Sequence, residues 1–293
     1  MIDFISGLLG GIIRVIYNVC GNNYLIALLI FTFLTKLLLF PLMLKQLKST
    51  AGIQKIAPEY NKLREKYKDN PVKLQEETTR LYAENKISPM AGCLLPIIQI
   101  PIILAMFFVV KQPLTYIAQM DQEQIASYTA EYLQKDVSEL TENEIKGYEI
   151  NIAKEYELLD MKIGSKISLG DTPKDAFSKD ESVRVSKWTL LIPILTLFFS
   201  ILSNQVSMRK AKQTMSEDQA EMQKSMSIMM PLLSAYISFA WPIALGIYWL
   251  FGSILGIGQQ LIIDKLMEDK TKDNDKKTKK NKVLFLGKGE NND

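Results

Sequence analysis

A single lysine, Lys36, lies inside the first long apolar segment of the chain, between Tyr24 and Leu44. A segment of this length can cross a bilayer, which takes about 20 apolar residues. Lys36 precedes Lys45, the expected end of the span, by nine residues, a depth of roughly 13 Å at about 1.5 Å per residue. A lysine side chain covers such a distance only in part by snorkelling. Lys36 is therefore predicted to face a polar cavity between membrane helices.

Polar side chains in the apolar segments could complete this cavity. They are Thr32, Thr35, Gln99, Asn204, Gln205, Tyr236 and Tyr248. No carboxylate lies in the interior of these segments, since the next charges lie at the ends of the spans, so an ammonium group there implies surrounding water or an incoming anion. Each uncharged polar residue, taken alone, is also explained by hydrogen bonding between helices.

The composition excludes several kinds of chemistry. The chain has no histidine, which removes histidine-based triads and most histidine-containing zinc sites. Its two cysteines, Cys20 and Cys93, lie in or beside apolar segments and are expected to be small packing residues. No nucleotide motif, metal cluster or nucleophile–base pair is found, so neither enzymatic activity nor a cofactor is expected. An intramembrane protease is not expected either, because the spans contain neither a histidine partner nor a convincing aspartate pair.

The elements that must position Lys36 are membrane helices. Long uncharged stretches predict an all-α integral membrane protein with five spans: 23–45, 88–111, 188–208, 225–241 and 242–264. The last two share one uncharged stretch, and Trp241 and Pro242 are suited to the turn between them. Residues 1–22 lack the basic region of a signal peptide and carry apolar residues at helical spacing. We interpret them as an amphipathic helix in the extracytoplasmic interface.

The charges of the connecting segments predict the orientation. Residues 45–86 carry ten basic and six acidic residues, and the tail from 265 carries nine and six. Residues 112–187 carry nine basic and fifteen acidic residues. Because basic loops stay in the cytoplasm, segments 46–87, 209–224 and 265–293 are assigned there. The acidic loop 112–187 and the N-terminus are assigned outside a bacterial plasma membrane.

The cytoplasmic segments suggest surfaces that receive a partner. Residues 46–87 read as an antiparallel helical hairpin broken at Asn70-Pro71, although a solvated linker is the alternative; its apolar stripe includes Ile53, Tyr60 and Leu63. Methionines recur at helical spacing before the fourth span: Met222, Met226 and Met229. Such a face adapts to many apolar partners, or it simply contacts lipid.

The exported loop and the C-terminal tail are both charged, but they are expected to differ in structure. In the exported loop, helices are expected near 121–135 and 141–159, the second opened by a capping box of Thr141 and Glu144. The tail 265–293 is charged and poor in aromatic residues, so disorder is expected. Its basic character suits anionic lipid or ribosomal RNA, or it is only solvated.

Four stretches, in this order, resemble the YidC family of membrane protein insertases within the YidC/Oxa/Alb superfamily. They are LLLFPLMLKQLKSTAGIQKIAPEYNKLREKY (37–67), SPMAGCLLPIIQIPIILAMFFVV (88–110), LIPILTLFFSILSNQ (191–205) and MMPLLSAYISFAWPIALGIYWLFGSILGIGQQ (229–260). The resemblance is to the Gram-positive-like form, without the large N-terminal extracytoplasmic domain. It implies five spans around a hydrophilic groove that opens to the cytoplasm and lipid. In that groove Lys36 takes the place of a basic residue that is usually arginine.

The function implied is insertion of short-tailed membrane proteins into the bilayer without nucleotide hydrolysis. The partners implied are nascent membrane proteins and the lipid bilayer, with the ribosome, the signal recognition particle pathway and the Sec translocon as further candidates, and no DNA. The alternative is a secondary transporter or anion channel that uses Lys36 as counter-ion. Transporters commonly show internal repeats, and five spans show no such symmetry.

Overall fold

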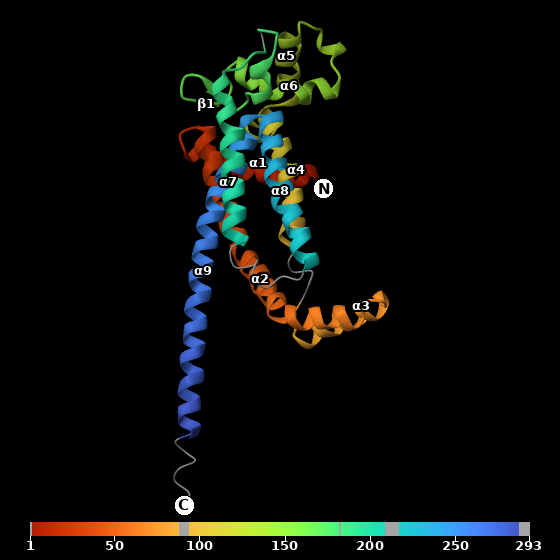
Figure 1. The fold of residues 1–293 in the computed structure, drawn as a ribbon. Coiled ribbons are helices and arrows are strands. Elements are labelled where there is room, and N and C mark those ends of the chain that lie inside the picture. Colours follow the sequence, from red (N-terminus) through yellow and green to blue (C-terminus); the bar gives the residue numbers. More distant parts are fainter. Residues whose placement is uncertain (1, 88–93, 182, 209–216, 287–293) are drawn as a thin grey trace, which may run out of the picture.

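The computed structural model describes residues 2–87, 94–181, 183–208 and 217–286. Within these ranges the protein is predominantly helical, and the prediction of an all-α membrane protein is confirmed. The long helices are α2 (Tyr24–Lys66), α4 (Leu94–Lys111), α7 (Leu191–Met208), α8 (Glu217–Ala240) and α9 (Ile243–Leu286). Helices α7, α8 and α9 pack against one another, and α9 also packs against α2 (Figure 1).

Four described segments are long and apolar enough to cross a membrane. They are Ile2–Val19, Tyr24–Gln46, Lys187–Ser207 and Ile243–Leu266. The shorter apolar helices Ile98–Lys111 and Ser227–Ala240 fall in the other two predicted spans. Residues 88–93, where the second predicted span begins, lie outside the described ranges.

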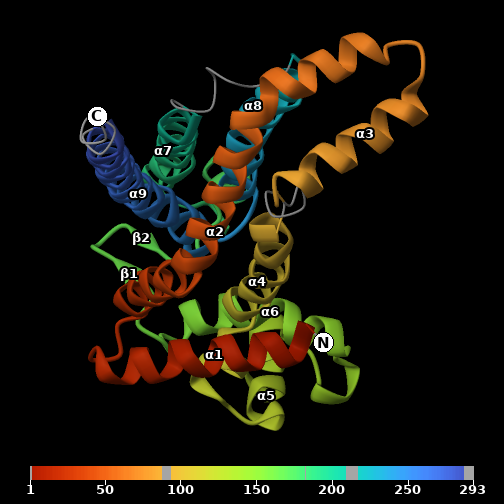
Figure 2. The ribbon, with the colours of Figure 1, turned by 90° about the horizontal axis from the view of Figure 1, so that it is seen from below.

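Helix α1 (Ile2–Val19) lies across the direction of α7 and α9 in both views (Figures 1 and 2). If those helices cross the bilayer, α1 lies roughly in its plane. This arrangement supports the interfacial position predicted from its spacing of apolar residues, although its length and composition would also suit a span.

The first predicted span and the first helix of the predicted hairpin form one continuous helix, α2, with no break in the helix at the boundary placed after residue 45. Pro41 and Pro58 lie inside α2, and the helix continues through both because flanking turns and neighbours can support it. Helix α3 (Pro71–Glu84) begins after Asn70, whose side chain accepts a hydrogen bond from the Lys73 amide at 3.1 Å. Helix α3 turns back along the end of α2 (Figure 2).

Two helices extend into segments that were predicted to be a loop and a disordered tail. Helix α8 begins at Glu217, within the loop expected at 209–224, and α9 continues as helix to Leu286, where disorder was expected from 265. Neither 217–224 nor 265–286 contains glycine or proline. A helix that has already formed extends readily through such residues, because propagation is far easier than nucleation.

Residues 112–181 and 183–187, from the loop that was predicted to be exported, form a small unit at one end of the bundle (Figure 1). It contains α5 (Gln122–Leu133) and α6 (Glu142–Glu155), and the predicted Thr141–Glu144 capping box is present. Strands β1 (Lys162–Ile163) and β2 (Ile167–Ser168) pair antiparallel and were not predicted. Short turns complete the unit: a π-helical turn η2 (Leu114–Ala118) and 3₁₀ turns η3 (Val137–Glu139), η4 (Pro173–Phe177) and η5 (Lys187–Leu190).

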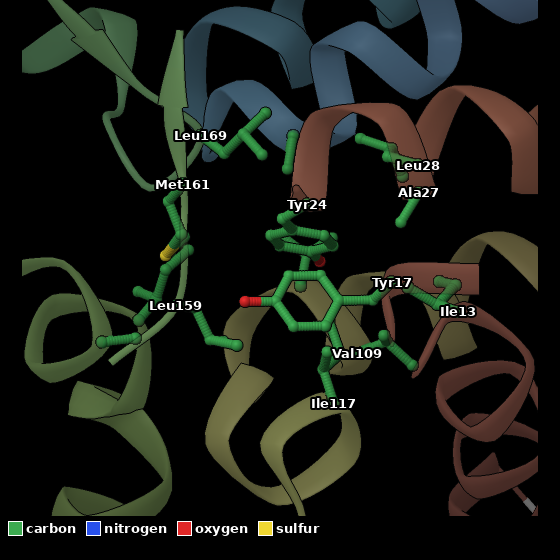
Figure 3. Packing of buried hydrophobic residues seen from close by; sticks show 14 of the residues in the cluster. Ile13, Tyr17, Tyr24, Ala27, Leu28, Val109, Ile117, Leu159, Met161 and Leu169 are labelled. Carbon is green, nitrogen blue, oxygen red and sulfur yellow. The ribbon is translucent and has the colours of Figure 1, made fainter. Parts of the chain in front are cut away.

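The main core joins this unit to the ends of the long helices. Figure 3 shows Tyr17 of α1 and Tyr24 of α2 among side chains from α4, from η2 and from the loop around Met161. Backbone contacts add to the apolar packing. The Tyr24 amide donates to the Asp160 carbonyl at 3.1 Å, and the Ile243 amide donates to the Asp171 carbonyl at 2.8 Å. The unit therefore supplies partners to the unpaired amides at the start of α2 and α9.

Candidate membrane-embedded site

Lys36 lies on the face of α2 that packs against α9. Its side chain is partly buried, and its end runs along Gly252: a Cβ atom placed on Gly252 would lie 3.3 Å from Lys36 Cε and 3.8 Å from Nζ. Across the described ranges, the ammonium group makes no hydrogen bond or ion pair. The structure thus places the Lys36 amine in an apolar span, and the described part of the chain supplies no hydrogen-bond or ion-pair partner for it.

The two threonines predicted near Lys36 use their hydroxyls within α2. Thr32 is buried and donates to the Leu28 carbonyl at 2.7 Å. Thr35 donates to the Phe31 carbonyl at 2.8 Å. The Thr32 methyl group lies near Gly252, 4.0 Å from a Cβ atom placed there. Thr32 therefore packs beside Lys36, and its hydroxyl donor is already committed to the helix backbone.

Gln99 and Tyr248 are brought together, as expected for residues of one polar cluster. The Gln99 side-chain amide, on α4, donates to the Tyr248 hydroxyl, on α9, at 3.1 Å. Tyr248 is buried and lies one helical turn before Gly252, on the same face of α9. The hydrogen bond therefore joins α4 to the face of α9 that contacts Lys36.

The remaining groove candidates lie in other contacts. Asn204 of α7 donates to the Ser227 carbonyl of α8 at 2.8 Å, which links those two helices. Gln205 is exposed on α7. Tyr236 is exposed on α8, where it lines a shallow apolar hollow with Met229, Leu232 and Leu233.

The candidates for substrate reception lie at two places. Ile53, Tyr60 and Leu63 are partly buried on the end of α2 that turns toward α3, and Leu63 lines a hollow with Leu81 of α3. Met229 is exposed on α8. The side chains of the other two methionines of that face, Met222 and Met226, lie outside the described residues.

The sequence analysis missed two residues that contact Lys36, both on α9. One is Gly252. The other is Gln259, whose side-chain amide donates to the Lys36 carbonyl at 2.8 Å. Gln259 belongs to a pair of glutamines inside an uncharged run, and its spacing of seven residues from Gly252 could have placed both on one helix face.

The chain was compared with known proteins. Residues 15–271 match the family model described as the 60Kd inner membrane protein. Membrane protein insertase YidC 2 of Listeria innocua is 30% identical over 257 residues, covering 85% of this chain and 67% of the relative. The YidC insertase of Oceanobacillus iheyensis is 27% identical over 260 residues, covering 86% of this chain and 80% of the relative. That of Clostridium perfringens is 46% identical over 89 residues, covering 30% of this chain and 37% of the relative.

The family model covers most of the chain, including every segment of the structure that lies around Lys36. The Listeria relative aligns with the chain over two thirds of its own length. Together with five apolar helical segments in the expected order, these matches are decisive. The chain belongs to the 60Kd inner membrane protein family, the family of the YidC membrane protein insertases.

Proposed function

We propose that this protein moves short-tailed membrane proteins from the cytoplasm into the bilayer, and that Lys36 receives the acidic tail of the substrate. The observation that carries this proposal is the ammonium group of Lys36, which lies in an apolar span and has no carboxylate partner among the described residues. A cation inside the membrane without a counter-ion attracts an anion strongly. The acidic tail of an incoming segment supplies such an anion.

The proposed insertion needs no nucleotide hydrolysis. A hydrophilic groove around Lys36 shortens the apolar distance that the tail must cross. The apolar part of the substrate leaves sideways into lipid, which stabilises the product by about 25 cal/mol per Å² of apolar surface removed from water. Lys36 holds the tail only while this transfer proceeds.

A lysine constrains the way in which the tail is held. Arginine offers a planar fork that binds a carboxylate through two parallel hydrogen bonds, whereas lysine presents a compact point charge. The proposed attraction is therefore electrostatic and tolerant of geometry. An arginine at position 36 should support it as well.

The surrounding parts have proposed roles in the same reaction. In a bacterial plasma membrane, with the N-terminus outside and the C-terminus in the cytoplasm, the α2–α3 hairpin and the exposed Met229 face would meet the nascent protein first. The basic end of α9 could contact the ribosome. Cooperation with the signal recognition particle pathway and the Sec translocon belongs to the same proposal.

The test replaces Lys36 by Arg, Gln and Glu in cells depleted of their own insertase. The readout is insertion of a single-span reporter whose exported tail carries no, one or two acidic residues. Arg should support insertion, whereas Gln and Glu should fail increasingly as tail acidity rises. Equal insertion of every tail by all three variants would overturn the role of Lys36. Ion flux through sealed vesicles that contain the purified protein would instead favour a channel or transporter.

A further inference from the structure

One face of α9 contacts Lys36 at two separate points. Gly252 lies against the end of the side chain, and the Gln259 side-chain amide donates to the Lys36 carbonyl at 2.8 Å. The two residues are seven positions apart, close to two full turns, so they share a face of the helix. Helix α9 therefore contacts both the backbone and the charged end of this residue.

We infer that Gly252 is a positioning residue that sets where the Lys36 ammonium group lies. This inference rests on the proposed function of Lys36 and adds a residue from another helix to it. The Gly252 position is buried, and a Cβ atom there would be 3.3 Å from Lys36 Cε, closer than ordinary van der Waals contact. A Cβ atom there requires the end of the lysine to shift by a few tenths of an ångström, and a larger side chain requires more.

The neighbouring contacts fix the rest of the arrangement. Thr32, one turn before Lys36 on α2, packs toward Gly252, and its hydroxyl is held by the Leu28 carbonyl. The Gln259 hydrogen bond holds the backbone of α2 at residue 36 against α9. Because the backbone is held, a larger side chain at position 252 must be accommodated by movement of the flexible lysine stem. The ammonium group would then be displaced from α9.

Displacement of the charge should change which substrates are inserted, while general insertion continues. A neutral tail gains nothing from the ammonium group, so its insertion does not depend on where the ammonium lies. The insertion of an acidic tail depends on it, because the interaction of two charges weakens as the distance between them grows. The signature of a positioning role is therefore a loss that grows with tail acidity.

The experiment uses the full-length protein with Gly252→Ala, Gly252→Leu and the matched control Gly258→Leu. Gly258 lies on the same helix, and a Cβ atom there meets nothing within 4 Å. The readout is the ratio of insertion of a two-acid tail to that of a neutral tail, at equal protein levels. We expect Gly252→Leu to lower this ratio by roughly threefold or more, as for residues in direct contact. Gly252→Ala should lower it less, and Gly258→Leu should leave it unchanged.

A double-mutant cycle separates a positioning role from a merely structural one. In a Lys36→Gln background, Gly252→Leu should have no further effect on the ratio, because the charge through which Gly252 acts is gone. A ratio unchanged by either Gly252 variant, while Lys36→Gln lowers it, overturns the positioning role alone. A ratio unchanged by Lys36→Gln overturns the proposed role of Lys36, and the positioning role of Gly252 with it. If the Gly252→Leu protein does not accumulate, the same comparison is made with Gly252→Ala. That variant should then lower the ratio when Lys36 is present and leave it unchanged in the Lys36→Gln background.

Discussion

Glu149 of α6 accepts two hydrogen bonds from Thr115 of η2, one from the backbone amide at 2.8 Å and one from the hydroxyl at 2.7 Å. The carboxyl group is buried, and burial raises its pKa to about 7, against the lowering effect of the Thr115 and Leu114 hydrogen bonds and of Lys146. A protonatable group thus lies where α6 packs against η2, the turn that follows α4.

The buried Glu149 carboxyl group should make the stability of the protein depend on pH. The pKa of Glu149 is higher in the folded protein than its ordinary value of 4.5, so folding favours the protonated form. The stability that this group contributes is complete below pH 4.5 and is lost as pH rises through about 7. At most, the difference is on the order of 3 kcal/mol. The chain has no histidine, so few other side chains titrate between pH 5 and 8.

Thermal unfolding of the detergent-solubilised protein at pH 5 and pH 8 measures this effect. We expect a higher unfolding temperature at pH 5, and Glu149→Gln should remove most of the difference by raising stability at pH 8. Glu139→Gln, at an exposed position, is the control and should retain it. A Glu149→Gln variant with the wild-type pH dependence would contradict the assignment.

The capping box of α6 should stabilise the same unit. The Thr141 hydroxyl accepts a hydrogen bond from the Glu144 amide at 3.3 Å, and the Glu144 carboxylate accepts one from the Thr141 amide at 2.9 Å. Thr141→Ala should therefore cost about 1 kcal/mol and speed hydrogen exchange in α6. Ser127→Ala, which removes a hydroxyl from the middle of α5, should change exchange in α6 little.

The close packing of α1 against η2 should depend on Gly10. A Cβ atom on Gly10 would lie 2.7 Å from Tyr116 Cβ and 3.0 Å from its carbonyl oxygen. Gly10→Ala should cost roughly 1 to 3 kcal/mol through overpacking, measured by thermal unfolding. On Gly11, a Cβ atom meets nothing within 4 Å, so Gly11→Ala should be neutral or slightly stabilising. Equal effects of the two substitutions would show that α1 is not held at this point.

The hydrogen bond between Gln99 and Tyr248 should couple α4 to α9. Hydrogen bonds between membrane helices contribute about 0.6 kcal/mol on average and rarely reach 2 kcal/mol. A double-mutant cycle of Gln99→Leu and Tyr248→Phe, read by unfolding in detergent, should give a coupling energy within this range. Additive effects of the two substitutions would mean that this contact is not formed in the membrane.

The proposed orientation can be tested by labelling single cysteines in intact cells. In a background without Cys20 and Cys93, Ser165→Cys in the exposed β1–β2 turn should react with an impermeant thiol reagent added outside. Glu76→Cys, exposed on α3, should react only after the membrane is permeabilised. The reverse pattern would overturn the orientation inferred from the loop charges.

The sequence was sufficient for features that depend on local patterns. Apolar length located the membrane helices, Asn70-Pro71 marked the break before α3, and the Thr141–Glu144 pair marked the start of α6. The continuity of α2 could not be predicted in the same way, because a change from apolar to charged composition does not by itself end a helix.

The candidate site was predictable in part. Lys36 stood out because a charge in an apolar span is rare, and polar residues on other spans were identified by the same contrast. The contact between Lys36 and Gly252 depends on how α2 and α9 pack, and a glycine gives no polar signal. Asn204 shows the opposite failure: its polarity was visible, but packing joins it to α8 at the Ser227 carbonyl.

The continuity of α2 has a mechanical consequence. Its 43 residues form one helix whose path is about 65 Å long at the usual rise, with Lys36 in the apolar half and the hairpin at the other end. A nascent chain that pulls or tilts the hairpin therefore also moves the helix that bears the charged residue, without any intervening loop to absorb the motion. Pro41 and Pro58, which weaken the helix locally, should set how much of that motion reaches the interior of the membrane.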